Sequence, residues 1–374
     1  MSAIARTDTS IFGKWWWTVD RWTLGALFLL VLIGALLILA ASPAVAERIG
    51  LDAYHFVQRQ FVIMPVALAV MVGMSLLPPL QIRRLAVIGF VATVVMLVLV
   101  PLVGPEIKGA TRWLSIGGLS IQPSEFAKPF FAVVTAWMFA EWRRDETFPG
   151  HLIAIALYLV TAALLLSQPD LGMTVVVSAI WFGQFFLAGL PMILVVGFIA
   201  TGVSGLIGAY FLFPHVSSRI DRFLDPSAGD SYQVDRSLEA FMNGGLLGTG
   251  PGEGTVKAYL PDAHADFIFS VAGEEFGGIA CLVIIALYAF VVLRGYARLL
   301  GEQSLFVLLA GTGLLTQFAL QALIHMASSV HMMPAKGMTL PFISYGGSSL
   351  LALGLGMGMA LALTRKRFGG EDLP

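Results

Sequence analysis

A histidine and two carboxylates stand at the start of an apolar run in the C-terminal half of the chain. His264 and Asp266 directly precede the run that begins at Phe267, and Glu275 follows nine residues after Asp266. A carboxylate at the rim of an apolar segment can act as a general base toward a hydroxyl group held beside it. Asp is also a favoured helix N-cap residue. Asp266 is therefore the candidate catalytic residue, and both interpretations stay open.

A second polar group precedes another apolar run. Arg112 lies in a short polar segment, and Glu125 and Lys128 follow at the start of the run, where Ser124 or a neighbour can cap a helix. Their spacing of three places Glu125 and Lys128 on one helix face. The pair is either a helix-start ion pair or part of a functional site, because ionisable groups at the ends of membrane spans are costly.

A polar segment at 214–265 contains arginines that could bind phosphate oxygens: Arg219, Arg222 and Arg236. Its glycines at 244–254 fit neither a P-loop nor a dinucleotide-binding motif. A nucleotide site is therefore not indicated. The shorter string Gln168-Pro169-Asp170 indicates a tight turn in which Asp170 caps the next helix.

The last polar segment, 326–342, contains Lys336 and leads to Ser344. The serines after it lie among small residues suited to helix packing, so serine protease chemistry is not indicated. His325 and His331 lack a third ligand at metal spacing, and no metal site is predicted. The glycines at 354–358 have spacings that let helices approach closely.

The composition shows that a membrane must position these residues. Of 374 residues, 57% are hydrophobic and 12% are charged, and the mean hydropathy is +0.85. Soluble domains have about 25% charged residues, so soluble enzymes and nucleic-acid-binding proteins are excluded. Repeated apolar runs of about 20 residues predict an all-α integral membrane protein with ten transmembrane helices. The predicted spans are 22–42, 60–78, 85–103, 122–140, 151–167, 171–189, 191–213, 267–293, 304–325 and 343–363.

Both termini are predicted to be cytoplasmic, because ten spans return the chain to its starting side. The cytoplasmic segments then hold 12 basic and 8 acidic residues, and the rest of the chain holds 10 and 15, as the positive-inside rule expects. The predicted organisation is a cytoplasmic N-terminal segment 1–21, a single membrane domain 22–363 and a cytoplasmic tail 364–374. One long outer loop, 214–265, joins the seventh and eighth helices. Because long loops are usually functional, we expect function on the outer face.

Six motifs in these polar segments occur in the order and topology of a known family. They are RWLSIGGLSIQPSEFAK, QPDLG, SRIDRFLDP, GGLLGTG, LPDAHADFIFSVAGEEFG and MPAKGMTLPFISYGGSSL. Over nearly the whole chain they resemble the SEDS family, the FtsW/RodA polytopic membrane proteins. The string at 335–341, with its lysine, resembles the division branch, FtsW, more than the elongation branch, RodA. The family often has His-Thr-Asp at 264–266, where this chain has His-Ala-Asp.

The resemblance implies a peptidoglycan glycosyltransferase that polymerises lipid II on the periplasmic face of the bacterial cytoplasmic (inner) membrane, at the division septum. It implies that Asp266 matches the essential aspartate, and we expect this group to accept the proton of the acceptor hydroxyl in an inverting displacement. The implied partners are lipid II, a class B penicillin-binding protein transpeptidase and other division proteins. No cofactor is expected, and any divalent cation would be held jointly with the substrate diphosphate.

The departing undecaprenyl diphosphate needs cations around it. In addition to Asp266, the candidate substrate-binding residues are Arg112, Glu125, Lys128, Arg219, His264, Glu275, Lys336 and Ser344. The basic members would bind the diphosphate, and the two glutamates would orient them.

Other functions remain open. The chain could be a lipid II flippase, a non-catalytic scaffold for the transpeptidase, or a RodA-like elongation polymerase. Transporters tend to show repeated halves with broken helices and a site at the membrane midplane. The sequence shows no convincing repeat, and its candidate residues gather on the outer side. This distribution favours an enzyme.

Overall fold

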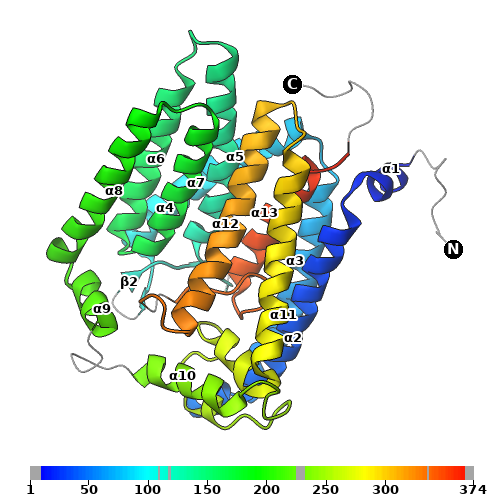
Figure 1. The fold of residues 1–374 in the computed structure, drawn as a ribbon, viewed down its shortest axis with the longest axis vertical. Coiled ribbons are helices and arrows are strands. Elements are labelled where there is room, and N and C mark those ends of the chain that lie inside the picture. Colours follow the sequence, from blue (N-terminus) through cyan, green and yellow to red (C-terminus); the bar gives the residue numbers. More distant parts are fainter. Residues whose placement is uncertain (1–9, 108–109, 117–118, 225–231, 335–336, 367–374) are drawn as a thin grey trace.

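Long, roughly parallel helices form a bundle in this chain (Figure 1). The computed structural model describes residues 10–366 except 108–109, 117–118, 225–231 and 335–336. Each predicted span overlaps one long helix. These helices are α2 (Arg21–Arg48), α3 (His55–Ser75), α4 (Pro79–Val103), α5 (Pro123–Arg144), α6 (Gly150–Ser167), α7 (Leu171–Leu187), α8 (Met192–Leu212), α11 (Ile268–Leu299), α12 (Leu305–Ser329) and α13 (Gly347–Leu363).

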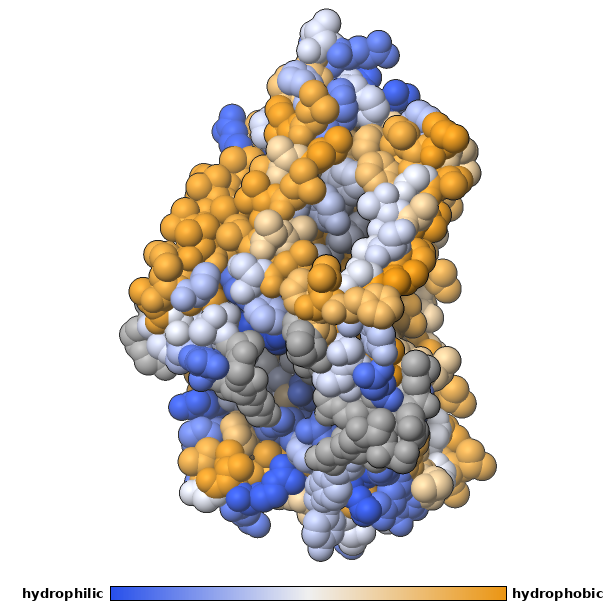
Figure 2. Space-filling view, turned by 90° about the vertical axis from the view of Figure 1, so that its left-hand side faces the viewer, coloured by the Kyte–Doolittle hydropathy of each residue, from blue (hydrophilic) through white to orange (hydrophobic). Residues whose placement is uncertain are grey.

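Their composition suits a membrane. Within the described residues, seven helices are long and apolar enough to cross one: α2, α3, α4, α6, α8, α11 and α12. Helices α7 and α13 are shorter apolar helices. Figure 2 shows apolar residues over the middle of one face and hydrophilic residues gathered toward its two ends. The prediction of an all-α, multi-pass membrane protein is confirmed, and the count of ten crossings stays a prediction.

Helix α5 lies at the centre of the bundle and packs against α4, α6, α7, α12 and α13. Most of its residues are buried, including the charged residues of its first turns. Helix α13 packs closely along α3, because glycines on α13 face the α3 backbone. A Cβ atom at Gly354 would lie 2.5 Å from the carbonyl oxygen of Ala67, and one at Gly358 would lie 2.5 Å from that of Met71. The predicted packing role of these glycines is confirmed.

The polar segments are more ordered than predicted. The segment 214–265 contains α9 (Pro214–Leu224), α10 (Tyr232–Gly244) and the 3₁₀ helix η2 (Val256–Ala258). These helices are too polar to be recognised as spans. The segment 104–124 contains two antiparallel hairpins, β1 (Glu106–Ile107) with β2 (Ala110–Thr111) and β3 (Leu114–Ile116) with β4 (Leu119–Ile121). Strands of two or three residues are too short to produce a readable alternating pattern. The sequence analysis therefore did not predict the secondary structure inside these two segments.

The two ends of the described chain lie together. Helix α1 (Ile11–Thr18) is joined to the end of α13, because Arg365 Nε donates to Thr18 Oγ1 at 3.0 Å and the Lys366 backbone N–H donates to the Thr18 carbonyl at 3.1 Å. Helices α9 and α10 lie at the opposite end of the bundle, at the bottom of Figure 1. The first and last described residues therefore lie at the same end of the bundle.

Candidate active site

Asp266 lies in the turn at 261–267 that leads into α11, at the end of the bundle opposite the termini. Its side chain is half-buried. The N-cap of α11 is Phe267 rather than Asp266, so the alternative capping role is wrong. The carboxylate faces Gly337 instead: a Cβ atom there would lie 3.0 Å from Asp266 Oδ2, and Gly337 has a positive φ of 67°. A glycine at this position leaves room for the carboxylate.

The loop at 337–346 holds the Asp266 turn in place through hydrogen bonds to its backbone. Ser344 Oγ donates to the Ala265 carbonyl at 2.6 Å and accepts from the Leu340 N–H at 2.8 Å. The Tyr345 N–H donates to the His264 carbonyl at 2.9 Å. Ser344, predicted to bind substrate, therefore positions the residue next to Asp266.

His264 is buried between two aromatic rings. It stacks on Phe56 with centroids 4.3 Å apart and lies 5.0 Å from the ring of Tyr345. Burial lowers the pKa of His264 to about 4. The imidazole is therefore neutral near pH 7, and its role here is to pack the turn rather than to supply positive charge.

Two arginines missed by the sequence analysis flank this aromatic cluster, and both side chains are exposed. Arg48 donates to two backbone carbonyls before the turn, at 3.4 and 3.5 Å, and its charge contributes to the lowered pKa of His264. Burial raises the pKa of Tyr345, and the charge and hydrogen bond of Arg59 oppose that rise. The predicted topology offered a signal for both, because it puts these two arginines on the outer side, which the positive-inside rule disfavours.

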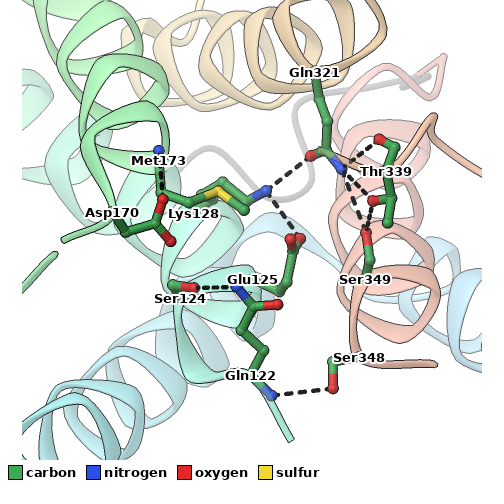
Figure 3. A network of polar contacts seen from close by, with 10 residues as sticks. All are labelled: Gln122, Ser124, Glu125, Lys128, Asp170, Met173, Gln321, Thr339, Ser348 and Ser349. Carbon is green, nitrogen blue, oxygen red and sulfur yellow. Dashed lines mark hydrogen bonds and ion pairs between the residues drawn. The ribbon is translucent and has the colours of Figure 1, made fainter. Parts of the chain in front are cut away.

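Lys128 is fully buried in α5 and held by two partners (Figure 3). Its Nζ donates to Glu125 Oε2 at 2.9 Å and to Gln321 Oε1 at 2.8 Å. The predicted ion pair between Glu125 and Lys128 is confirmed. Ser124 or a neighbour was predicted to cap this helix; the N-cap of α5 is Gln122, two residues before Ser124, and its side chain forms no capping hydrogen bond.

Gln321 of α12 carries this network to the 337–346 loop. Its Nε2 donates to the carbonyl and hydroxyl oxygens of Thr339 at 3.2 and 3.1 Å, and to Ser349 Oγ at 3.3 Å (Figure 3). The Lys128 network therefore joins α5, α12, α13 and the loop that holds the Asp266 turn. Lys128 is therefore connected to the 337–346 loop through the side chain of Gln321.

Arg112 is engaged with the turn between α6 and α7. Its Nε donates to the Gln168 carbonyl at 3.1 Å and its Nη2 to the Pro169 carbonyl at 2.6 Å. Asp170 accepts from the Met173 N–H at 3.3 Å and caps α7. The predicted capping role of Asp170 is confirmed, and Arg112 fastens the turn that contains it.

Glu274 and Glu275, in the first turns of α11, are buried and hold the segment after α10. Glu275 forms an ion pair with Lys257, a cation that the sequence analysis did not single out. Glu274 accepts hydrogen bonds from the backbone N–H groups of Val256 and Lys257 and from the side chain of Asn243, at 2.7 to 2.9 Å. Glu275 was predicted to orient one of the basic candidate residues. It pairs with a cation, but that cation is Lys257.

Two predicted residues cannot be placed within the site. Arg219 belongs to α9, but its side chain lies outside the described part of the structure, as does Lys336 entirely. Their roles stay predictions.

The Lys128 network generates a stability prediction. Replacing Lys128 by Met leaves the Glu125 carboxylate buried without its counter-charge, which should cost about 3–5 kcal/mol. The double variant Glu125→Gln/Lys128→Met removes both charges and should regain much of that loss. Thermal unfolding of the purified protein in detergent measures both variants. A double variant no more stable than Lys128→Met would contradict the assignment.

His264 generates a pH prediction. Its folded pKa of about 4 lies below the ordinary 6.5, so the unfolded chain binds the proton first. The stability that neutral His264 contributes is complete above about pH 6.5 and is lost as the pH falls toward 4. Between pH 7 and pH 5 the wild type should lose about 2 kcal/mol through this group.

The His264→Phe variant keeps a ring between Phe56 and Tyr345 but removes the titration, so its unfolding free energy should fall less over the same range. Denaturant titrations at the two pH values provide the comparison. Equal losses in both proteins would count against a buried neutral imidazole.

Comparison with known proteins places this geometry in a family. The family of FtsW, RodA and SpoVE, described as "Cell cycle protein", matches residues 21–368. The chain is 47% identical over 368 residues to the "Probable peptidoglycan glycosyltransferase FtsW" of Caulobacter vibrioides, covering 98% of this chain and 94% of that protein. It is 34% identical over 347 residues to the protein of the same name from Escherichia coli O157:H7, covering 89% and 83%.

Solved structures have the same fold. One from a study entitled "Structural coordination of polymerization and crosslinking by a peptidoglycan synthase complex" superposes with a TM-score of 0.76 at 27% identity, covering 92% of this chain and 97% of that one. The rod shape determining protein RodA of Thermus thermophilus superposes with a TM-score of 0.67 at 27% identity, covering 93% and 97%. This chain belongs to the FtsW/RodA (SEDS) family, in its FtsW branch.

Proposed function

We propose that this peptidoglycan glycosyltransferase of the FtsW type polymerises lipid II with Asp266 as its general base. The observation that carries the proposal is the position of Asp266, a half-buried carboxylate in a turn fixed by Ser344 and Tyr345. The names of the relatives support the glycosyltransferase activity. The turn lies at the rim of the apolar helix α11, where a lipid-anchored sugar can meet a polar group.

The chemistry requires one proton acceptor and one good leaving group. The C4 hydroxyl of the GlcNAc of one lipid II attacks the anomeric carbon of the MurNAc of another, and Asp266 accepts the hydroxyl proton as the new glycosidic bond forms. The bond from that carbon to the diphosphate oxygen breaks, and undecaprenyl diphosphate leaves with the electron pair. Glycosidases need a second carboxyl group to protonate a poor leaving group, whereas a diphosphate leaves without one.

The leaving diphosphate needs cations that other groups have not already neutralised. Lys128 and Lys257 are buried and paired with glutamates. Arg48 and Arg59 are exposed beside the aromatic cluster that packs the Asp266 turn. We therefore assign the diphosphate to Arg48 and Arg59 together with the predicted Arg219 and Lys336, while Arg112 and Lys128 position the elements that carry the site.

The membrane arrangement belongs to the same proposal. The chain crosses the membrane ten times with both termini in the cytoplasm, so the Asp266 end of the bundle faces the periplasm. The protein acts at the division septum. The shared location of α1 and the end of α13 supports this arrangement. The similar structure from a study of a peptidoglycan synthase complex that couples polymerisation to crosslinking supports a class B penicillin-binding protein as partner.

The decisive variant is Asp266→Asn, which preserves shape and removes the base. Lipid II polymerisation by the purified protein with its transpeptidase should fall by about 10²–10⁴-fold. The matched control is Asp262→Asn, four residues earlier in the same turn, where the positive φ of 51° suits Asn as well as Asp. The control should keep most of the activity. Full activity of Asp266→Asn would remove the general base assignment.

A flipping assay in sealed vesicles separates the enzyme from the transporter. Suppose that the Asp266→Asn protein moves lipid II across the bilayer as fast as the wild type and also polymerises it as fast as the wild type. This result would favour the flippase. Loss of polymerisation alone supports the enzyme.

Ser344→Ala tests how the turn is positioned. The substitution removes the bond to the Ala265 carbonyl and leaves the Leu340 N–H buried without its acceptor, so the turn should shift. A displacement of about 1 Å near a reacting group costs about 10²-fold, and we expect kcat for lipid II polymerisation to fall about 10- to 100-fold. The control Ser167→Ala removes an exposed serine whose hydroxyl donates to the Leu164 carbonyl of its own helix. Equal rates in the two variants would contradict the positioning role.

A further inference from the structure

A pocket of about 590 Å³ opens at the end of the bundle that carries the termini. It lies between the α1–α2 corner, the C-terminal part of α11 and the residues after α13. Its polar lining is formed by Asp20, Arg21, Arg294, Arg298 and Lys366. The pocket is at the opposite end from Asp266, so the glycosyltransferase chemistry does not use it.

The lining carries an excess of positive charge. Asp20 is the acidic side chain among the described lining residues, and it is buried. It accepts a hydrogen bond from Arg294 Nε at 2.6 Å and forms an ion pair with Arg298, whose Nε lies 3.1 Å from Asp20 Oδ2. Four cations against one carboxylate leave a net charge of +3. An anionic ligand would neutralise part of this positive charge.

The arginines keep donors for such a ligand. Each of Arg294 and Arg298 meets Asp20 through its Nε, and within the described part of the chain the terminal Nη atoms of both have no protein acceptor. Their side chains are 32% and 20% exposed, so these nitrogens can meet a ligand from solvent or lipid. A guanidinium fork is well suited to phosphate oxygens.

The surroundings place the pocket at the depth of lipid head groups. Helix α1 exposes Ile11 and Phe12, and Trp22 at the start of α2 is 72% exposed. The guanidinium of Arg21 lies over the rings of Trp16 and Trp17, at 5.6 and 5.3 Å. Tryptophans and arginines with this arrangement are typical of the boundary between membrane and water.

An apolar surface continues from the pocket toward the membrane interior. Leu293, next to Arg294, is 68% exposed, and Phe290 one turn earlier is 39% exposed. A ligand with an acyl chain would gain burial along this face of α11, whereas a free phosphate would gain none.

From these contacts we propose that the pocket binds the phosphate group of an anionic phospholipid. The phosphodiester accepts from the terminal nitrogens of Arg294 and Arg298, Arg21 and Lys366 complete the charge balance, and the acyl chains lie along α11. The site ties the α1–α2 corner to α11 and to the chain after α13.

The test removes the two cations that Asp20 does not need. In Arg21→Ala/Lys366→Ala the buried Asp20 keeps both arginine partners, so the fold is preserved, and an unchanged melting temperature in lipid-free detergent verifies this. Native mass spectrometry against phosphatidylglycerol measures the affinity. Each cation near a membrane surface changes affinity about 5-fold, so we expect about 30-fold weaker binding.

The control variant Arg84→Ala/Arg144→Ala removes two exposed cations from the same end of the bundle but outside the pocket, and its affinity should change less than about 2-fold. Phosphatidylcholine should bind the wild type at least about 10-fold more weakly than phosphatidylglycerol. Unchanged phosphatidylglycerol affinity in Arg21→Ala/Lys366→Ala would overturn the proposal, as would equal binding of the two lipids. Displacement of phosphatidylglycerol by inorganic phosphate at an equal concentration would assign the pocket to the free anion instead.

Discussion

The requirement that every charge buried in the bundle have a partner determines how the site is held. A lone ammonium group in the interior of α5 would be costly, so Lys128 needs both Glu125 and Gln321. Because Gln321 also binds Thr339, the same network fixes the 337–346 loop. That loop holds the turn of Asp266 through Ser344. The position of the Asp266 carboxylate therefore depends, over several contacts, on the ion pair between Glu125 and Lys128.

The same constraint organises the segment between α10 and α11. Buried Glu274 binds backbone N–H groups and Glu275 pairs with Lys257, so two carboxylates inside the start of α11 hold the chain that covers it. Close contact is possible because Gly277, with a φ of 80°, allows α11 to kink, and a Cβ atom there would lie 2.3 Å from the Leu246 carbonyl. Carboxylates that look out of place in an apolar run thus have a structural role.

The sequence predicted the long helices well and the contacts between them poorly. Apolar runs are local signals, and each one became a helix. The ion pair of Glu125 with Lys128 was also local, since three residues separate them. Gln321 was not predicted, because 193 residues separate it from Lys128 and only the fold brings them together. Lys257 was not predicted either, because it lies 18 residues before Glu275, outside any helix spacing. The hairpins and the helices α9 and α10 were missed because short or polar elements lack a strong periodic signal.

The difference between buried, paired cations and exposed cations also indicates which basic side chains are available to bind an anionic ligand. A lysine already bonded to a carboxylate in the interior gains little from a second anion and would have to give up its partner to reach one. Exposed arginines such as Arg48 and Arg59 have no such cost. In the proposed topology they lie on the outer side of the membrane, where the positive-inside rule disfavours basic residues. A basic residue kept against that bias needs another reason to be there. The proposed binding of a diphosphate beside the Asp266 turn would supply one, whereas Lys128 is explained by the network that it holds together.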